Sequence, residues 1–290
     1  MGAAGRRQTK RETAVFFAVT FALSWLPWLY VLAAERWSLP MPLSRDVLLR
    51  AGTFGPSVSG LILAYLFGGK DEIRSLLRSM LRVRIGAGWL LFAFFVLPAV
   101  SAVTCLIFWL AGGALPQPEF EVWLIPVAFL YILVLMGPLG EEAGWRGFAL
   151  RRMLRVASPV KSALVLGVVW TLWHLPLFFI EGTTQHALTG FGFLAALVCY
   201  LLYTVMISVL ITLLFVKSRG NVLAAMIFHT MGNLSLGAMP LVFSKSGAAL
   251  LLLVLAAAAC GLTYKHRGTM FGKSNGWREE DEMSVLSKRA

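Results

Sequence analysis

The chain has 290 residues, of which 58% are hydrophobic and 14% are charged, and its mean hydropathy is +0.76. These values exclude an ordinary soluble domain and indicate a polytopic membrane protein. The net charge of +12 does not predict nucleic-acid binding, because the basic residues lie in loops between apolar runs and not on one face of a soluble module.

Apolar runs follow one another along the chain, and eight of them are candidates for helices that cross a bilayer. We therefore expect an all-α fold of about eight transmembrane helices in a single membrane domain, residues 1–290. The runs cover approximately residues 14–34, 47–67, 89–110, 122–142, 162–180, 191–216, 222–242 and 248–262, and the last of them is the shortest.

The segment 69–86, between the second and third runs, has an amphipathic pattern. Apolar residues such as Ile73 and Leu77 recur at helical spacing, while Arg74 and Arg78 occupy the other face. The pattern predicts a helix that lies on the surface of an anionic leaflet.

Two further segments lie outside the apolar runs. Residues 148–156 continue the fourth run, and we expect them to lie at the membrane surface. Residues 265–290 are polar and predict a mobile cytoplasmic tail.

The distribution of Lys and Arg predicts the orientation of the chain. If the N-terminus is cytoplasmic, 22 of the 26 basic residues fall on the cytoplasmic side. Because cytoplasmic loops of membrane proteins carry an excess of Lys and Arg, we expect both termini in the cytoplasm. We further expect an integral protein of a prokaryotic plasma membrane.

Four polar groups fall at a similar depth within three of the predicted helices. Counted from the nearest cytoplasmic charges, Glu141 and His229 lie about 15 Å into their helices and His174 about 20 Å, at 1.5 Å per residue. Asn233 is one turn deeper than His229. Ionisable groups inside a membrane are costly and usually functional, so these residues predict one buried site.

Helical spacing adds local geometry to this site. Glu142 can pair with Arg146 four residues later, which leaves Glu141 turned by about 100° toward another helix. Trp170 and His174 share a face in the same way, as do His229 and Asn233. Pro176 follows His174 and is expected to kink that helix.

Three alternatives to an enzyme remain open at this point. Either histidine alone could simply bond two helices together. A proton-coupled transporter could use the two carboxylates, although its ionisable groups should follow a path across the whole bilayer. A non-enzymatic scaffold that confers immunity by binding a partner is a further alternative, and an enzyme is the interpretation that we favour.

Three motifs, in order, carry a resemblance to a known family. Glu141 and Glu142 with Arg146 form EExxxR, an aromatic residue stands four before His174, and His229 is followed by xxxAsn233. From about residue 120 to 240 the chain resembles the CAAX protease and bacteriocin-processing family. The sequence departs from the family at Trp170, where Phe is usual, a change we expect to affect only the wall of the cavity.

The resemblance implies an eight-helix intramembrane endopeptidase that acts on a membrane-associated peptide or lipidated protein. Glu141 and His174 would activate water, and His229 and Asn233 would stabilise the oxyanion. Glu142, Arg146 and Trp170 would support the site.

The same residues also allow a metal-dependent version of the site. Glu141, His174 and His229 would bind zinc and leave a fourth position for water. The sequence lacks HExxH, the compact zinc motif of many metalloproteases. We therefore expect no tightly bound metal.

Overall fold

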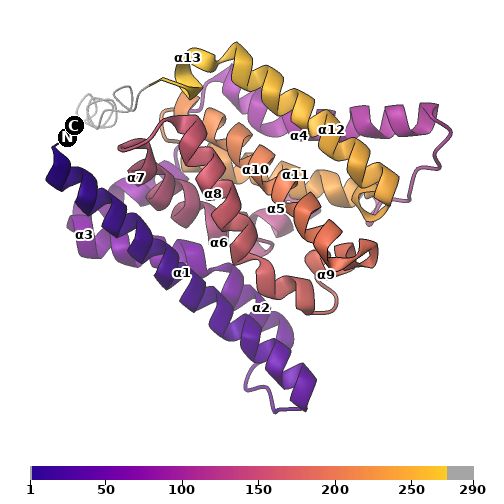
Figure 1. The fold of residues 1–290 in the computed structure, drawn as a ribbon, viewed down its shortest axis with the longest axis horizontal. Coiled ribbons are helices and arrows are strands. Elements are labelled where there is room, and N and C mark those ends of the chain that lie inside the picture. The colour runs from indigo at the N-terminus through magenta and orange to yellow at the C-terminus, as the bar shows by residue number, and fades with distance from the viewer. Residues whose placement is uncertain (1, 273–290) are drawn as a thin grey trace.

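The computed structural model describes residues 2–272, which fold as helices without any strand (Figure 1). The longer α-helices are α1 (Ala3–Trp37), α3 (Gly55–Met80), α4 (Ala87–Leu110), α5 (Ile125–Leu135), α8 (Pro159–Trp173), α10 (Phe193–Lys217), α11 (Val222–Ala238) and α12 (Lys245–Lys265). The shorter ones are α2 (Arg45–Thr53), α6 (Pro138–Glu142), α7 (Arg151–Leu154), α9 (Thr184–Leu188) and α13 (Arg267–Met270). The 3-10 turns are η1 (Val122–Leu124), η3 (Leu175–Phe179), η4 (Thr189–Phe191) and η5 (Leu241–Phe243), and η2 (Ala143–Leu150) is a π-helix.

The all-α prediction is confirmed, and about eight spans are compatible with the described residues. Six helical runs there are long and apolar enough to cross a membrane, and α2 with α3, bent by 45°, makes a seventh if counted as one span. The remaining predicted run corresponds to α11, which has 17 residues.

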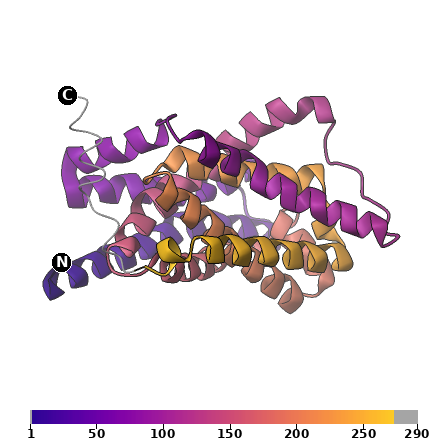
Figure 2. The ribbon, with the colours of Figure 1, turned by 90° about the horizontal axis from the view of Figure 1, so that it is seen from above.

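Helices that are distant in sequence surround a central group. α1 packs against α3 on one side of the molecule, and α4 packs against α12 on the other (Figure 1). α8, α10 and α11 lie between these pairs, and α10 contacts both of the others. α5 lies at the outer edge (Figure 2).

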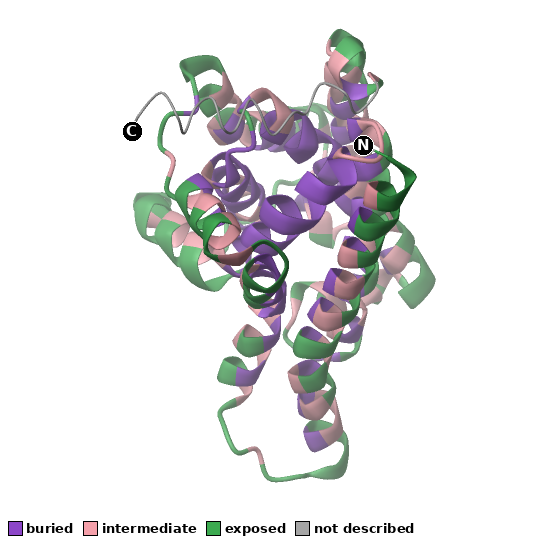
Figure 3. Ribbon diagram, turned by 90° about the vertical axis from the view of Figure 1, so that its left-hand side faces the viewer, coloured by how far each residue is buried: buried purple, intermediate pink, exposed green. Residues whose placement is uncertain are grey.

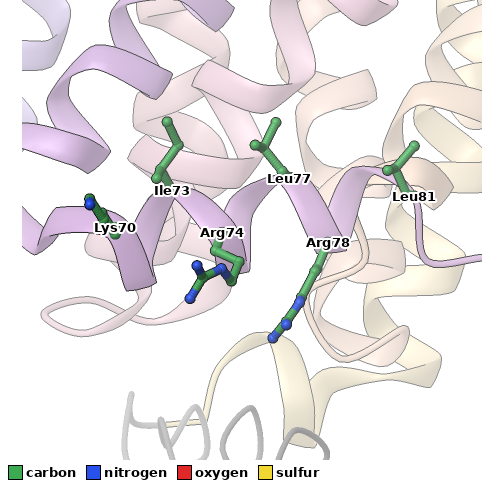
Figure 4. A pocket seen from close by; sticks show the side chains of 6 residues that line it. All are labelled: Lys70, Ile73, Arg74, Leu77, Arg78 and Leu81. Atoms are coloured by element: carbon green, nitrogen blue, oxygen red, sulfur yellow. The ribbon is translucent and has the colours of Figure 1, made fainter.

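Helix α3 changes character at Gly69, whose φ of 67° lies in the left-handed region. The amphipathic segment after this break is helical as far as Met80, with Leu77 and Leu81 on the side opposite Arg74 and Arg78 (Figure 4). Its apolar face does not lie wholly toward lipid, because Leu76 is only 1% exposed.

The segment from Pro138 to Leu154 is buried at every position except Leu139, and buried residues gather in the interior of the molecule (Figure 3). Residues 148–154, which we expected to lie at the membrane surface, are all buried, so this segment packs inside the protein and not on its exterior. Burial is possible because Arg152 forms ion pairs with Glu12 and Glu72, both at 2.7 Å. Arg146, Arg151 and Arg152 are thus internal residues and not loop charges.

Glycine permits the closest helix contact in this region. A Cβ on Gly144 would lie 2.0 Å from the carbonyl oxygen of Pro56 in α3. A Cβ on Gly60 would lie 2.8 Å from the Cα of Gly144. The backbones of α3 and η2 therefore touch, and this contact holds the end of α6 inside the bundle.

The first residues of the segment that we expected to be a mobile tail, residues 265–290, are helical. Arg267–Met270 form α13, and Met270 is fully buried in a cluster with Ala163, Val209 and Leu213. The polar composition of residues 265–290 gave no sign that Met270 would be buried. Residues 273–290, the rest of that prediction, lie outside the described residues.

Candidate active site

Glu141 and Glu142 end the short helix α6, immediately before the π-helix. Glu141 is 4% exposed and Glu142 is fully buried. Gly137 starts this helix with a φ of 119°, and a Cβ there would lie 2.5 Å from Glu141 Oε1. The positive φ and the lack of room for a Cβ both require glycine at this position. The turn at Gly137 ends α5 and directs the two carboxylates into the protein.

Glu142 has two basic partners. The predicted pairing with Arg146 is present, with Arg146 Nη1 donating to Glu142 Oε1 at 2.8 Å. His229 Nδ1 lies 2.8 Å from the same oxygen, a contact that the sequence did not predict. Removing any one of these three groups leaves a buried charge or donor without its partner.

Glu141 has a different environment. Trp170 Nε1 donates to Glu141 Oε2 at 2.7 Å, and within residues 2–272 no Lys or Arg side chain forms an ion pair with Glu141. The guanidinium of Arg146 stacks on the Trp170 ring, with Cζ 4.5 Å from the ring centroid. Trp170 is thus more than the cavity wall that we expected, because a phenylalanine could not donate this hydrogen bond.

His174 lies where α8 ends. The expected kink at Pro176 takes the form of a change from α-helix to the 3-10 turn η3. His174 Nδ1 lies 2.7 Å from the carbonyl oxygen of Trp170. The imidazole ring also contacts Tyr200, with the ring centroids 5.2 Å apart.

The partners of the two histidines determine which nitrogen donates. His174 Nδ1 faces a backbone carbonyl and His229 Nδ1 faces a carboxylate, and both partners are acceptors. Both Nδ1 atoms must therefore carry a proton. In a neutral ring, Nε2 then bears a lone pair, so His229 can donate from Nε2 only when it is protonated.

The rings of the site are in direct contact. Trp170 and His229 pack edge to face with centroids 5.2 Å apart, and Trp170 and His174 lie 5.8 Å apart. A Cβ on Gly137 would meet both Glu141 Oε1 and His229 Cε1. Glu141, His174 and His229 thus surround Trp170, although they lie on three different helical segments.

Asn233 follows His229 by one turn of α11 and is half-buried. Its Nδ2 donates to the carbonyl oxygen of Met136 at 3.4 Å. Met136 precedes the Gly137 turn, so Asn233 lies beside the chain segment that presents Glu141.

The sequence analysis missed several supporting residues. Tyr200 of α10 contacts His174, and Gln185 Nε2 donates to the Tyr200 hydroxyl at 2.9 Å. Trp25 of α1 donates to the carbonyl oxygen of Trp173 at 2.9 Å. A tyrosine within an apolar run was the available signal for Tyr200, whereas nothing local marked Gln185 or Trp25.

The zinc-dependent version of the site, with Glu141, His174 and His229 as ligands, stays a prediction. Over the described part of the chain, no three His, Cys, Asp or Glu side chains are grouped so that they could hold a metal ion. The Nδ1 atoms of both histidines face protein acceptors, so Nε2 is the ring nitrogen of each that would be left to bind a metal.

These features define a class: a multi-pass membrane protein that encloses a buried site of acid and imidazole groups. Residues 123–235 match the family model described as type II CAAX prenyl endopeptidase Rce1-like. The chain is 24% identical over 233 residues to CAAX prenyl protease 2 of Methanococcus maripaludis, an alignment that covers 78% of this chain and 84% of that protein.

Both matches support the resemblance to the CAAX protease and bacteriocin-processing family that the motifs carried, and they indicate a protease, which is a peptide hydrolase. The matched residues fall within the segment from 120 to 240 that carried the resemblance. The matches therefore favour an enzyme over the scaffold and the transporter.

Proposed function

We propose that this protein is an intramembrane endopeptidase in which Glu141 is the general base. The observation that carries the proposal is the difference between the two adjacent carboxylates. Glu142 is engaged by Arg146 and His229, whereas Glu141 accepts a hydrogen bond from the neutral indole of Trp170. A buried carboxylate without a paired cation is well placed to accept a proton from water.

The first step is attack of water on the scissile carbonyl. Glu141 takes one proton from the water while the oxygen forms a bond to the carbonyl carbon. His174 orients the water, because its Nε2 lone pair can accept a hydrogen bond. The electron pair of the C=O bond moves onto the carbonyl oxygen and produces a tetrahedral oxyanion.

His229 and Asn233 stabilise that oxyanion. His229 acts in its protonated form, donating from Nε2 while Glu142 accepts from Nδ1 and balances the positive charge. Asn233 donates through its side-chain amide. Such donors are strongest in a site that excludes water. The C–N bond then breaks, and the proton held by Glu141 passes to the leaving amine.

The substrate class that we propose is a lipidated protein with a cleavable C-terminal peptide. The name of the Methanococcus maripaludis relative, CAAX prenyl protease 2, supports a prenylated substrate. The depth of about 15 Å predicted for Glu141 from residue counting supports it as well, because a lipid anchor would bring the adjoining peptide into the membrane.

No step of this mechanism passes through a metal ion. We expect hydrolysis to continue in protein that has been washed with a chelator and shown by elemental analysis to lack zinc. Stoichiometric zinc whose removal abolishes hydrolysis, and whose return restores it, would contradict the proposed role of Glu141.

We also propose a cytoplasmic location for both termini in a prokaryotic plasma membrane. The excess of basic residues on that side supports the orientation. Cysteine labelling of single-cysteine variants in intact cells would test it.

The decisive experiment compares two glutamate variants in proteoliposomes. Mass spectrometry would follow cleavage of a farnesylated peptide ending in a CAAX sequence, with the unmodified peptide as the second substrate. We expect Glu141→Gln to lower the rate by about 10²–10⁴-fold, the range of general-base catalysis. The matched control is Glu121→Gln, an exposed residue at the start of the same helical run.

The outcomes separate the parts of the proposal. Equal cleavage of both peptides would show that the enzyme has no preference for a prenylated substrate, while the proposed protease activity would stand. Full activity of Glu141→Gln, with unchanged thermal unfolding, would remove Glu141 as the base. Cleavage of neither peptide by the wild-type protein would show that the substrate is of a different kind.

A further inference from the structure

A hollow of about 720 Å³ lies outside the candidate active site, between the loop that joins α3 to α4 and the loop that joins α10 to α11. Four of its lining residues are basic, and no described acidic side chain lines it: Arg82, Arg84, Lys217 and Arg219. Such a concentration of one charge repels itself and favours an anionic ligand.

The hollow has a fixed frame. Arg82 Nη2 donates to the backbone carbonyl oxygens of Ser218 and Arg219, at 2.9 and 2.7 Å. Asn221 Nδ2 donates to the carbonyl oxygen of Arg82 at 2.7 Å. Arg219 has a φ of 57°, a left-handed conformation that is uncommon for residues other than glycine. Two distant loops are therefore locked together around the basic side chains.

Three of the four cations are available to a ligand. Arg84 and Arg219 are exposed and Lys217 is half-buried. None of these three forms an ion pair with any residue from 2 to 272.

His266 lies beside the hollow and is affected by the positive charge around it. Its ring lies 5.6 Å from the Trp89 ring, which lines the hollow. Burial lowers the pKa of His266, and the charges of Lys217 and Lys265 lower it further.

The hollow also offers exposed apolar surface. Leu81 and Val83 are 78% and 75% exposed, and both line it together with Trp89. Leu81 also lines the neighbouring groove along α3, where Lys70, Arg74 and Arg78 alternate with apolar residues (Figure 4). An ordinary anion would use only the cations, whereas an amphiphile would use both kinds of surface.

We propose that this hollow binds the phosphate headgroup of an anionic phospholipid. Its position fits such a ligand, because Lys217 ends α10 and Trp89 lies in the first turn of α4, two helices long and apolar enough to span the membrane. Basic pockets at the ends of membrane helices bind anionic headgroups in this way. The acyl chains would extend along the exposed apolar surface of α4, where Leu91 is 59% exposed.

The site is connected to the candidate active site through α11. Asn221, which ties the two loops together, also caps α11 by accepting from the backbone N–H of Ala224 at 2.9 Å. The same helix carries His229 and Asn233 farther along. A bound headgroup would therefore brace the end of the helix that supplies both residues.

The test measures lipid binding directly and does not depend on the proposed protease mechanism. Full-length protein would be reconstituted with phosphatidylcholine and titrated with phosphatidylglycerol, and native mass spectrometry would count the retained lipid. The variant carries Arg84→Gln, Lys217→Gln and Arg219→Gln. We expect about 100-fold weaker retention of phosphatidylglycerol, from roughly fivefold for each cation.

The matched control removes the same charge from another surface. Arg6→Gln, Arg7→Gln and Lys10→Gln change three exposed cations of α1, and this variant should retain phosphatidylglycerol as the wild-type protein does. Equal loss in both variants would show a general charge effect and overturn the site. If the triple variant does not fold, Arg84→Gln alone should still weaken retention about fivefold, and unchanged retention would overturn the proposal.

Two further arms separate other occupants. Inorganic phosphate at the same concentration should not displace phosphatidylglycerol, because it cannot contact Leu81 and Val83. Displacement would assign the hollow to free anions and overturn the lipid proposal. The sequence also contains an acidic run at residues 279–282. If phosphatidylglycerol binds only after that run is neutralised, the hollow belongs to the chain itself and the proposal is wrong.

Discussion

Two consecutive parts of one helical run have opposite surroundings. Residues 122–135, which form η1 and α5, contain no buried residue. Residues 140–154, beginning three positions beyond the Gly137 turn, are all buried. Both are rich in apolar residues, so hydropathy alone does not distinguish them.

The difference shows what each part does. The outer part presents its side chains to the surroundings of the protein, where one apolar residue can replace another. The inner part fits neighbouring backbone and charged groups closely, so each position depends on a specific partner. Substitutions in the two parts should therefore differ in size, and four predictions test this.

The largest effect should come from Arg146→Leu. This change leaves the buried Glu142 carboxylate without its guanidinium partner, and breaking a buried ion pair costs about 3–5 kcal/mol. The control is Arg50→Leu, since Arg50 bonds the Tyr131 hydroxyl in the outer part and should contribute about 1 kcal/mol or less. Thermal unfolding in lipid nanodiscs would measure both, and equal shifts would contradict the contrast.

Trp170→Phe should mainly reduce catalysis. It removes the donor to Glu141 Oε2, and hydrogen bonds to charged groups contribute about 1.5–3 kcal/mol, or roughly 10–100-fold in kcat. Trp123→Phe makes the same chemical change at a residue that is 75% exposed, and kcat should not change. If Trp170→Phe raises only KM, the indole contributes to substrate binding and does not position the base.

Gly144→Ala should destabilise the fold by about 1–3 kcal/mol, because its Cβ has no room beside Pro56. Gly88→Ala is the control, since a Cβ at Gly88 has no neighbour within 4 Å. Differential scanning fluorimetry of both variants would measure the contrast. A Gly144→Ala protein as stable as the wild type would mean that α3 and η2 can separate without cost.

The smallest effect should come from Val127→Ala. This residue is 63% exposed on α5, and surface substitutions usually change stability by less than about 0.5 kcal/mol. A larger loss of thermal stability would show that the outer part packs against another protein molecule in the membrane.

Local patterns predicted much of this architecture. Apolar runs located the helices, and the i,i+4 rule located the pair of Glu142 and Arg146, because both depend on neighbours in sequence. The similar depth of Glu141, His174 and His229 came from residue counting alone, since a helix rises by a fixed amount per residue.

Other features depend on contacts between distant segments, which periodicity does not contain. The bond between His229 and Glu142 joins residues 87 positions apart, and that between Trp170 and Glu141 joins residues 29 apart. Arg152 looked like a surface charge because its partners, Glu12 and Glu72, belong to other helices. For the same reason the sequence did not predict that residues 148–154 are buried inside the protein.

The π-helix at residues 143–150 makes the length of this segment as important as its composition. Its wider turns contain more residues than an α-helix of equal rise. Deleting one residue there would favour an α-helix and rotate everything that follows by about 100°. Arg152 would then turn away from Glu12 and Glu72, so a shortened chain could keep every motif residue and still lose the architecture that assembles them.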